Sequence, residues 1–399
     1  MNNQINKIIS ALFIGNLGSG ILSFFIGLYI LKISGSALSF GFTQVIGPIV
    51  SMMLLPFLGP MIDKYDKKYS LATAQLISIL SLICFLFLFN FFEQNAIFWI
   101  YLLLIFLKIA DLILTTSFAA SISELVEKDD VQKVKSMQQL VNATSMILSP
   151  IIGGAVFKFF SISAATSMEA ILEVVVLLII IKLNINPIES VTTNDENIFI
   201  MFKSGISYIL SDKLLFLALF MGMFFNFIFA SINIGMPYLQ VTVLKFPAII
   251  YSISETCFGI GLITTAIFLL KVKISQPLKF SYKMIGLLSI IMLIFSIALH
   301  FITSIPSLLV ITANLVFGIL ITVINIPVSS WMTNYIDSEF QGRVFSILNT
   351  GIQILSPLGI ILYSVLFDKF NVTSIFFISG IITLIVVLIY PKVMKVSFE

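Results

Sequence analysis

The chain has 399 residues, of which 59% are hydrophobic and only 10% are charged, and its formal net charge is +3. A soluble domain is typically about 45–50% apolar and about 25% charged, so this composition excludes an ordinary soluble domain and indicates an integral membrane protein. The basic residues lie in short loops between apolar runs, so the positive charge does not indicate nucleic-acid binding.

Repeated apolar runs of roughly 20 residues predict helices that cross the membrane. Strands of an outer-membrane barrel alternate apolar and polar residues instead, and these runs are continuous. The first run, at residues 8–31, exceeds the about 7–15 apolar residues of a signal peptide, so it is predicted to be a first span. Twelve helices are predicted, at about residues 8–31, 38–62, 70–91, 96–121, 136–160, 164–183, 214–236, 248–270, 280–300, 305–331, 343–367 and 372–391.

The longest polar stretch separates the sixth predicted helix from the seventh. We therefore expect an all-α membrane protein made of two pseudo-symmetric six-helix bundles. The expected N-terminal bundle is residues 1–184 and the expected C-terminal bundle is residues 213–399. Residues 185–212 form the expected cytoplasmic linker, and its second part, residues 198–210, has the pattern of an amphipathic surface helix.

The two halves repeat a short motif. Residues 149–153 read Ser-Pro-Ile-Ile-Gly in the fifth predicted helix, and residues 356–359 read Ser-Pro-Leu-Gly in the eleventh. Each proline removes a backbone hydrogen bond within a span, so bends or close contacts are expected there. Parallel halves related about the membrane normal are typical of transporters, whose substrate site lies between the halves near the bilayer midplane.

The distribution of basic residues sets the predicted orientation. With both termini in the cytoplasm, 17 of the 22 Lys and Arg residues fall on the inner side, four fall on the outer side, and Lys108 lies within a span. Inner loops of membrane proteins carry an excess of Lys and Arg. The chain is therefore expected to be a multi-pass cell-membrane protein, and its richness in Lys, Ile, Asn and Phe suggests a bacterial genome.

A charged segment at residues 59–68 separates the second and third predicted spans, and five of its ten residues are charged. Such a cluster cannot lie in hydrocarbon, and its basic excess suggests the cytoplasmic surface. The segment resembles the loop between helices 2 and 3 of the major facilitator superfamily, in which Gly is followed four residues later by Asp and then by basic residues. The matching residues are Gly59, Asp63, Lys64, Lys67 and Lys68. Asp66 stands where a second Gly is usual.

Further stretches resemble the same superfamily. Ser-Pro-Ile-Ile-Gly-Gly at residues 149–154 resembles its antiporter motif, with Ser149 in place of a Gly. Three stretches resemble the macrolide-efflux branch: Ser-Gly-Ser-Ala at residues 34–37, Ile-Ser-Glu-Thr-Cys-Phe-Gly at residues 253–259, and Gly-Arg-Val-Phe-Ser at residues 342–346. The resemblance covers most of the chain and implies a drug:proton antiporter.

The resemblance also implies residues that gate conformational change. Asp63 would lock the two halves on the cytoplasmic side, with Arg343 as its partner across the halves. The alternative is a solvated loop that sets topology through its Lys residues alone. The expected gating residues are Gly59, Asp63, Lys64, Lys67, Arg343, Pro150, Gly153 and Gly154.

Five ionisable residues lie inside predicted spans, where such residues are costly and are functional candidates by default. Lys108 and Asp111 are three residues apart on one helix, so they share a face and can form an ion pair. A fixed structural pair is one interpretation. The resemblance implies another, because macrolide-efflux relatives carry a basic residue at the position of Lys108, which would then face the cavity.

Glu169 and Glu173 are four residues apart and also share a helical face. Two neighbouring carboxylates in a site of low dielectric constant cannot both ionise cheaply, which suits a proton-coupling site. The resemblance favours Glu169, because relatives carry an acid near it. The alternative is that one or both lie in solvent at the outer end of the helix.

Glu255 lies about two turns into the eighth predicted helix and is the leading candidate for binding substrate or proton. Tyr251 and Gly259 share its face, and glycines allow a helix or a ligand to approach closely. The alternative is a helix–helix hydrogen bond made by protonated Glu255. Amide side chains that could line a polar cavity or join helices are Asn16, Gln44, Gln138, Asn142, Asn226, Asn233, Asn325 and Gln353.

These features predict a secondary active transporter that exports amphipathic, drug-like or macrolide-like compounds in exchange for protons by alternating access. Uptake symport, or lipid or lysolipid transport by the same fold, is the alternative, and a non-transporting scaffold or receptor is a third. We expect no enzyme, cofactor or metal, because no nucleotide-binding loop is present and the chain has one His and two Cys. The expected partners are a small amphipathic substrate, protons and the lipid bilayer, with no nucleic acid, and the expected state is a monomer.

Overall fold

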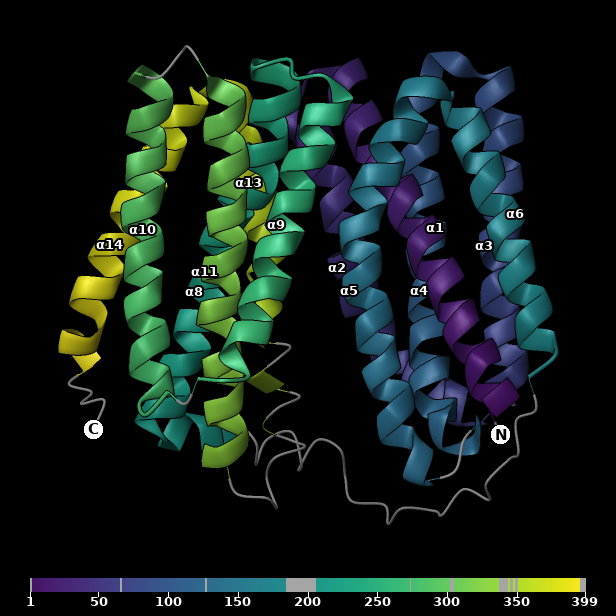
Figure 1. Ribbon diagram of the computed structural model, residues 1–399, viewed down its shortest axis with the longest axis horizontal. Coiled ribbons are helices and arrows are strands. Elements are labelled where there is room, and N and C mark those ends of the chain that lie inside the picture. The colour runs from purple at the N-terminus through teal and green to yellow at the C-terminus, as the bar shows by residue number, and fades with distance from the viewer. Residues whose placement is uncertain are drawn as a thin grey trace. The chain divides into compact units, whose positions relative to one another are not determined.

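The computed structural model describes residues 2–64, 67–125, 128–183, 206–272, 274–301, 305–336, 344, 347–348 and 351–394. These residues are almost entirely helical (Figure 1). The helices of the first half are α1 (Asn2–Ser34), α2 (Ala37–Lys64), α3 (Lys67–Phe91), η1 (Glu93–Asn95), α4 (Ala96–Leu125), α5 (Lys128–Phe159) and α6 (Ile162–Ile181). Those of the second half are α8 (Lys213–Tyr238), η2 (Leu239–Val243), α9 (Ala248–Leu269), α10 (Pro277–Phe301), α11 (Pro306–Tyr335), α13 (Ser356–Lys369) and α14 (Val372–Met394).

Twelve helices among the described residues are long and apolar enough to cross a membrane, which confirms the predicted fold class. A helix satisfies its backbone hydrogen bonds internally, and hydrocarbon offers no other partner for N–H and C=O groups. Many large apolar side chains on these helices are exposed, as expected of surfaces that face lipid.

The described chain divides into two compact units. Unit 1 comprises residues 1–35, 42–191 and 247–256, and unit 2 comprises residues 36–41, 192–246 and 257–399. The first turn of α2 therefore belongs to unit 2, and the first turns of α9 belong to unit 1. The boundaries expected from the sequence, with a linker at 185–212, stay a prediction, because residues 184–205 lie outside the described part of the chain.

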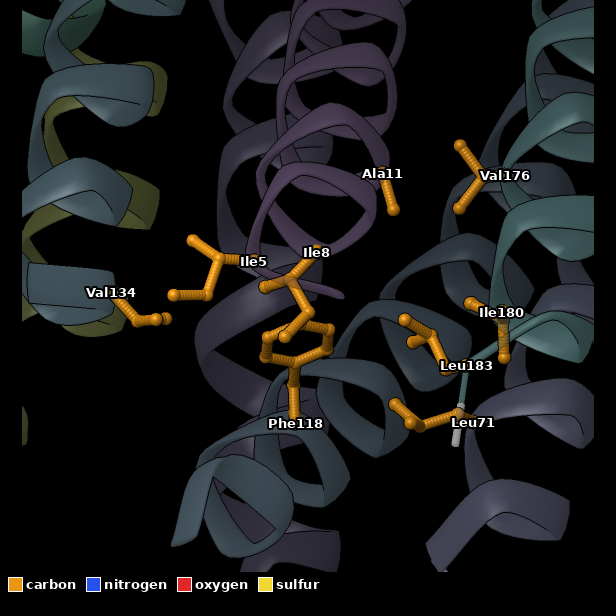
Figure 2. Close-up of a cluster of buried hydrophobic side chains, with 9 residues drawn as sticks. All are labelled: Ile5, Ile8, Ala11, Leu71, Phe118, Val134, Val176, Ile180 and Leu183. Carbon is orange, nitrogen blue, oxygen red and sulfur yellow. The ribbon is translucent and has the colours of Figure 1, made fainter. Parts of the chain in front are cut away.

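In unit 1, α1 packs against α5 and α6, and α3 packs against α4 and α6. Figure 1 shows α3 and α6 running side by side. A buried apolar cluster at one end of this unit joins α1, α3, α4, α5 and α6 (Figure 2). The ring of Phe118 lies against Ile8 in this cluster, and Leu71 lies near Ile180 and Leu183.

Unit 2 repeats the same pattern of helix pairs. Helix α8 packs against α13 and α14, and α10 packs against α11 and α14. Helices α9 and α11 also approach closely, because a Cβ atom at Gly261 or Gly318 would overlap backbone of the facing helix. The repeated pairing agrees with the repeated sequence motif of the two halves.

Several local details differ from the sequence prediction. Helix α2 extends to Lys64 and α3 begins at Lys67, so the charged segment at residues 59–68 lies mostly in the last turns of α2. Helicity continues there because the backbone bonds of a helix persist outside hydrocarbon. The predicted eleventh helix is interrupted by a turn at residues 354–355, and Pro357 lies in the first turn of α13, where its missing N–H costs nothing. Pro150 lies inside α5, which continues past it to Phe159.

Candidate functional site

Two buried carboxyl groups lie on α6 of unit 1. The side chains of Glu169 and Glu173 are 4% and 6% exposed, and their four-residue spacing places them on one face. Their burial argues against the alternative that they are solvated at the end of the helix. Buried acids are rare unless they are paired or functional.

Three neighbouring helices contribute to this acidic cluster. Gln75 of α3, which is 1% exposed, lies close to the Glu173 carboxyl. The charge of Asp111 on α4 acts on both Glu169 and Glu173. Gly18 of α1 lies against the Glu169 carboxyl, because a Cβ atom at Gly18 would overlap it. The structure therefore brings together acids that the sequence placed on separate helices.

Asp111 also forms the ion pair predicted from its spacing. Lys108 Nζ lies 3.0 Å from Asp111 Oδ2, and the two side chains are 34% and 37% exposed. The aliphatic part of Lys108 runs past Gly47 of α2. The pair leaves the acidic cluster with one compensated carboxylate and two carboxyl groups that have no cation bound to them in the described residues.

Glu255 belongs to the part of α9 that packs in unit 1. Its side chain is half-buried, and its charge acts on the buried phenol of Tyr251, one turn earlier. Tyr251 stacks on Phe24 of α1, with ring centroids 5.0 Å apart. Ser252, which follows Tyr251 in α9, lies against Gly154 of α5. Glu255 is thus held beside an aromatic stack, and Gly154 is a close-packing position.

A polar groove runs between α1 and α5 in the same unit. Asn16 Nδ2 donates a hydrogen bond of 2.7 Å to Asn142 Oδ1, and both residues line a groove of about 490 Å³. The buried hydroxyl groups of Ser145 and Ser149 line it as well and have no hydrogen-bond partner. Of the amide side chains named above, Asn16 and Asn142 therefore both join two helices and line a groove.

Unit 2 contains a cavity of a different chemical character. It has a volume of about 200 Å³, and none of its lining residues is charged. Apolar side chains such as Met221 and Phe225 share the lining with Asn226 and Asn325. The hydroxyl of Ser281, which is 1% exposed, also lines the cavity and has no hydrogen-bond partner. Such a cavity suits an apolar group that carries a hydrogen-bonding atom.

The start of α2 is held by a carboxylate that sequence reasoning missed. Asp368, at the end of α13, accepts hydrogen bonds from the N–H groups of Ala37 and Leu38, at 2.6 and 3.1 Å, and from Ser36 Oγ at 2.6 Å. Gly35 makes the turn from α1 with φ of 60°, which favours glycine. These bonds explain the Ser-Gly-Ser-Ala stretch: the glycine turns the chain, and Asp368 caps the next helix.

The charged segment at the α2–α3 junction is only partly described. Arg343 and the side chains of Asp63 and Lys64 lie outside the described residues, and their gating roles stay predictions. Lys68, the last residue of this segment, donates from Nζ to the carbonyl of Leu183 at 3.0 Å, and Lys7 Nζ of α1 donates to that of Lys182 at 3.1 Å. Cations at the C-terminal end of a helix offset its unpaired carbonyls, so two lysines stabilise the end of α6.

The chain matches the family model of the Major Facilitator Superfamily over residues 8–356. It belongs to the major facilitator superfamily. Macrolide efflux protein A of Streptococcus pyogenes is 22% identical to this major facilitator over 393 residues, which cover 95% of this chain and 93% of that protein. The match confirms the superfamily predicted from the charged segment and the Ser-Pro-Ile-Ile-Gly-Gly motif.

Solved structures show the same fold. The nucleoside transporter NupG superposes on this major facilitator with a TM-score of 0.75 at 14% identity, over 99% of this chain and all of that one. A bacterial homologue of the iron transporter ferroportin, in an inward-facing state, gives a TM-score of 0.73 at 11% identity, over 99% and 98% of the two chains. Family, fold and twelve apolar helices together make this protein a multi-pass membrane transporter.

Proposed function

We propose that this transporter exports small amphipathic compounds in exchange for protons. The observation that carries the proposal is the acidic cluster of unit 1, in which Glu169 and Glu173 are buried within reach of the charge of Asp111. Carboxyl groups in this setting are suited to taking up and releasing protons, because burial and like charge oppose full ionisation. The name of the streptococcal relative supports the direction of transport.

In this proposal the acidic cluster of unit 1 binds protons, and the region around Glu255 binds the substrate. Glu169 and Glu173 bind protons that enter from outside, and Glu255 binds a cationic group of the substrate beside Tyr251. Protonation of the carboxyl groups weakens binding of a cation and favours its release, and loss of the proton to the cytoplasm resets the site. At a membrane potential of 100 mV, each proton that moves inward provides about 2.3 kcal/mol from the potential alone.

The cavity of unit 2 supports the amphipathic character of the substrate. Its lining is uncharged and mostly apolar, with amide and hydroxyl groups at a few positions. A sugar or a nucleoside needs many hydrogen bonds to replace those it makes with water, whereas an apolar group needs few. The cavity therefore favours compounds with a large apolar part.

The test measures proton movement in everted membrane vesicles with a pH-sensitive dye. A panel of amphipathic cations and macrolides is added to vesicles that contain the wild-type protein or variants with neutralised acids. We expect drug-dependent proton release in the wild type and its loss in Glu169→Gln and in Glu255→Gln. Glu255→Asp, which keeps the charge, is expected to retain part of the response.

Two outcomes would contradict the proposal. Proton-dependent efflux that survives replacement of Glu169, Glu173 and Glu255 together would exclude these acids as the coupling groups. Drug movement into the cytoplasm, measured with labelled compounds in right-side-out vesicles, would show uptake instead of export. Protein level and folding in each membrane preparation are checked first, so that loss of the response reports transport.

A further inference from the structure

Helices α1 and α5 of unit 1 carry the same polar motif near the middle of their spans. Residues 16–23 and residues 142–149 both read Asn-x-x-Ser-x-x-x-Ser. Because the polar positions recur at intervals of three and four residues, each motif makes one stripe along its helix. The two helices pack together, and Asn16 Nδ2 donates to Asn142 Oδ1 at 2.7 Å. The two polar stripes therefore face each other.

The facing stripes line the groove of about 490 Å³ between these helices. Ser23 and Asn142 are exposed, whereas the side chains of Ser145 and Ser149 are only 6% exposed. None of the residues that line the groove is charged. The groove therefore offers amide and hydroxyl groups, which both donate and accept hydrogen bonds, and it offers no partner for an ion.

The hydroxyl groups of Ser145 and Ser149 are buried and have no hydrogen-bond partner among the described residues. Elsewhere in unit 1, Ser81, Thr166 and Ser167 each donate to the carbonyl four residues earlier, at 2.6 to 2.8 Å. A buried hydroxyl without a partner is costly, because it has lost its hydrogen bonds to water. Rotation about χ1 moves a serine hydroxyl between staggered positions, so a ligand in the groove can supply the missing partner.

Ser149 is the residue that departs from the antiporter motif, in which a Gly is usual. Its side chain fits because α1 has Gly20 opposite it, where a Cβ atom would overlap the hydroxyl. Pro150 has no N–H to donate to the carbonyl of Met146, and both residues line the groove. This stretch of α5 therefore adds a hydroxyl to the groove and leaves a backbone acceptor beside it.

We propose that this groove binds an uncharged, hydroxyl-rich group of the exported compound, such as a polyol or a sugar ring. Ser145 and Ser149 are its specificity-determining residues. A hydroxyl group of the ligand both donates and accepts, which matches the amides and hydroxyls of the lining. Such a group gives up its hydrogen bonds to water when it enters the membrane, and the polar side chains of the two stripes replace them.

The groove lies next to the cation site of the proposed function. Phe24 lines the groove and stacks on Tyr251, with 5.0 Å between the ring centroids, and Glu255 lies one turn from Tyr251. A compound whose amine binds Glu255 can therefore place a neighbouring group in the groove. This step rests on the proposed function, because it takes Glu255 as the cation site. It narrows the substrate class to amines that carry several hydroxyl groups.

Equilibrium dialysis of the purified protein in lipid nanodiscs tests the groove, with empty nanodiscs as the background. The probes are an N-alkyl-N-methylglucamine, which carries several hydroxyl groups, and the N-alkyl-dimethylamine with the same alkyl chain, which carries none. We expect the wild type to bind the glucamine more tightly. Ser145→Ala and Ser149→Ala should each reduce this preference by about two- to tenfold, the range of one neutral hydrogen bond, and leave the affinity for the dimethylamine unchanged.

The matched control is Ser117→Ala on α4. It removes another buried hydroxyl of unit 1 that has no partner among the described residues, but Ser117 does not line the groove. This variant should keep the wild-type preference. Thermal unfolding tests a purely structural role. Since the hydroxyls of Ser145 and Ser149 have no partner to lose, both variants should be as stable as the wild type, and a clear loss of stability would overturn the proposal.

Two binding results would also overturn the proposal. Equal affinity of the wild type for the two amines would mean that water alone fills the groove. An unchanged preference for the glucamine in both Ser145→Ala and Ser149→Ala would mean that these hydroxyls do not contact the ligand. A serine-dependent preference in a protein without drug-dependent proton release refutes the proposed export alone, whereas proton release without that preference refutes the groove alone.

Discussion

The two units place their acidic residues differently. In unit 1, Asp111, Glu169 and Glu173 lie within spans and contact other side chains. In the described part of unit 2, the acidic residues are Asp212 and Asp368, and both lie at helix ends. Asp212 accepts from two N–H groups at the start of α8, and Asp368 does the same for α2.

This difference separates carboxylates that cap helices from the buried carboxyl groups that we propose bind and release protons. A carboxylate that caps a helix accepts hydrogen bonds from backbone N–H groups, and its charge makes these bonds stronger than those to a neutral acceptor. In unit 1, Glu169 and Glu173 are buried within their span, and Glu173 Oε2 has no hydrogen-bond partner among the described residues. The uncharged cavity of unit 2 is suited to apolar groups instead. The proton binding that we propose therefore falls in unit 1, whereas the described acids of unit 2 cap helices.

The largest expected effect comes from placing a charge in the cavity of unit 2. Met221 lines this cavity on α8 and is buried. Met221→Glu should lower the free energy of unfolding by about 3 kcal/mol, the order of the cost of a charge within a span, because no cation lines the cavity. Met221→Gln, of nearly the same shape, should lower it much less. Thermal unfolding in nanodiscs above neutral pH measures both, and equal stability of the two variants would show that unit 2 tolerates charge.

A smaller effect is expected from removing a cap. Asp368→Ala should destabilise the protein by about 1–2 kcal/mol, because the N–H groups of Ala37 and Leu38 lose their acceptor. Asp368→Asn should fall between this variant and the wild type, since an amide oxygen still accepts without charge. Denaturant unfolding measures the difference. Wild-type stability of Asp368→Ala would mean that the carboxylate does not act as a cap.

The ion pair of unit 1 should contribute less to stability than that cap. Lys108 and Asp111 are about one-third exposed, and exposed pairs typically contribute about 0.2–1 kcal/mol. A double-mutant cycle with Lys108→Met and Asp111→Asn is expected to give a coupling energy in this range. A coupling energy well above this range would indicate a strongly buried pair. The interpretation that Lys108 offsets the charge of Asp111 only in part would then be wrong.

The smallest expected change is that of Glu173→Gln. Gln has the shape of the neutral acid and can hydrogen-bond to the nearby Gln75, so the free energy of unfolding should change by less than about 0.5 kcal/mol, below the contribution of a typical hydrogen bond. Glu173→Leu, which cannot bond to Gln75, is the matched comparison and should be less stable. A large loss in Glu173→Gln would show that the ionised form of Glu173 supports the fold, as the caps of unit 2 do.

Short-range features of the site were predictable from the sequence. The Lys108–Asp111 pair follows from a spacing of three residues on a helix, and the common face of Glu169 and Glu173 follows from a spacing of four. Gln75 was not predicted, although a glutamine in an apolar span was a signal. Its contact with Glu173 joins α3 to α6, and no local pattern specifies which face of one helix meets which face of another.

The contact of Asp368 with α2 could not be predicted from local patterns either. An acidic residue just after an apolar run is expected to lie in solvent at a helix end, so the sequence offers no reason to pair Asp368 with the start of α2. The turn at residues 354–355 lies directly before Ser356 and Pro357, where a bend or close contact was expected, although one continuous helix was predicted across it.

The sequence by itself determined that this protein is a twelve-helix membrane transporter of its superfamily, because span length, apolar content and short motifs are local properties of the chain. Tertiary structure decided which polar groups meet. It brought Gln75 close to Glu173 and Gly18 against Glu169. It also placed Asp368 at the N–H groups that begin α2, and it left the cavity of unit 2 without a charged lining residue. These contacts join residues far apart in the chain, and they depend on how helices pack, which hydrophobicity alone does not specify.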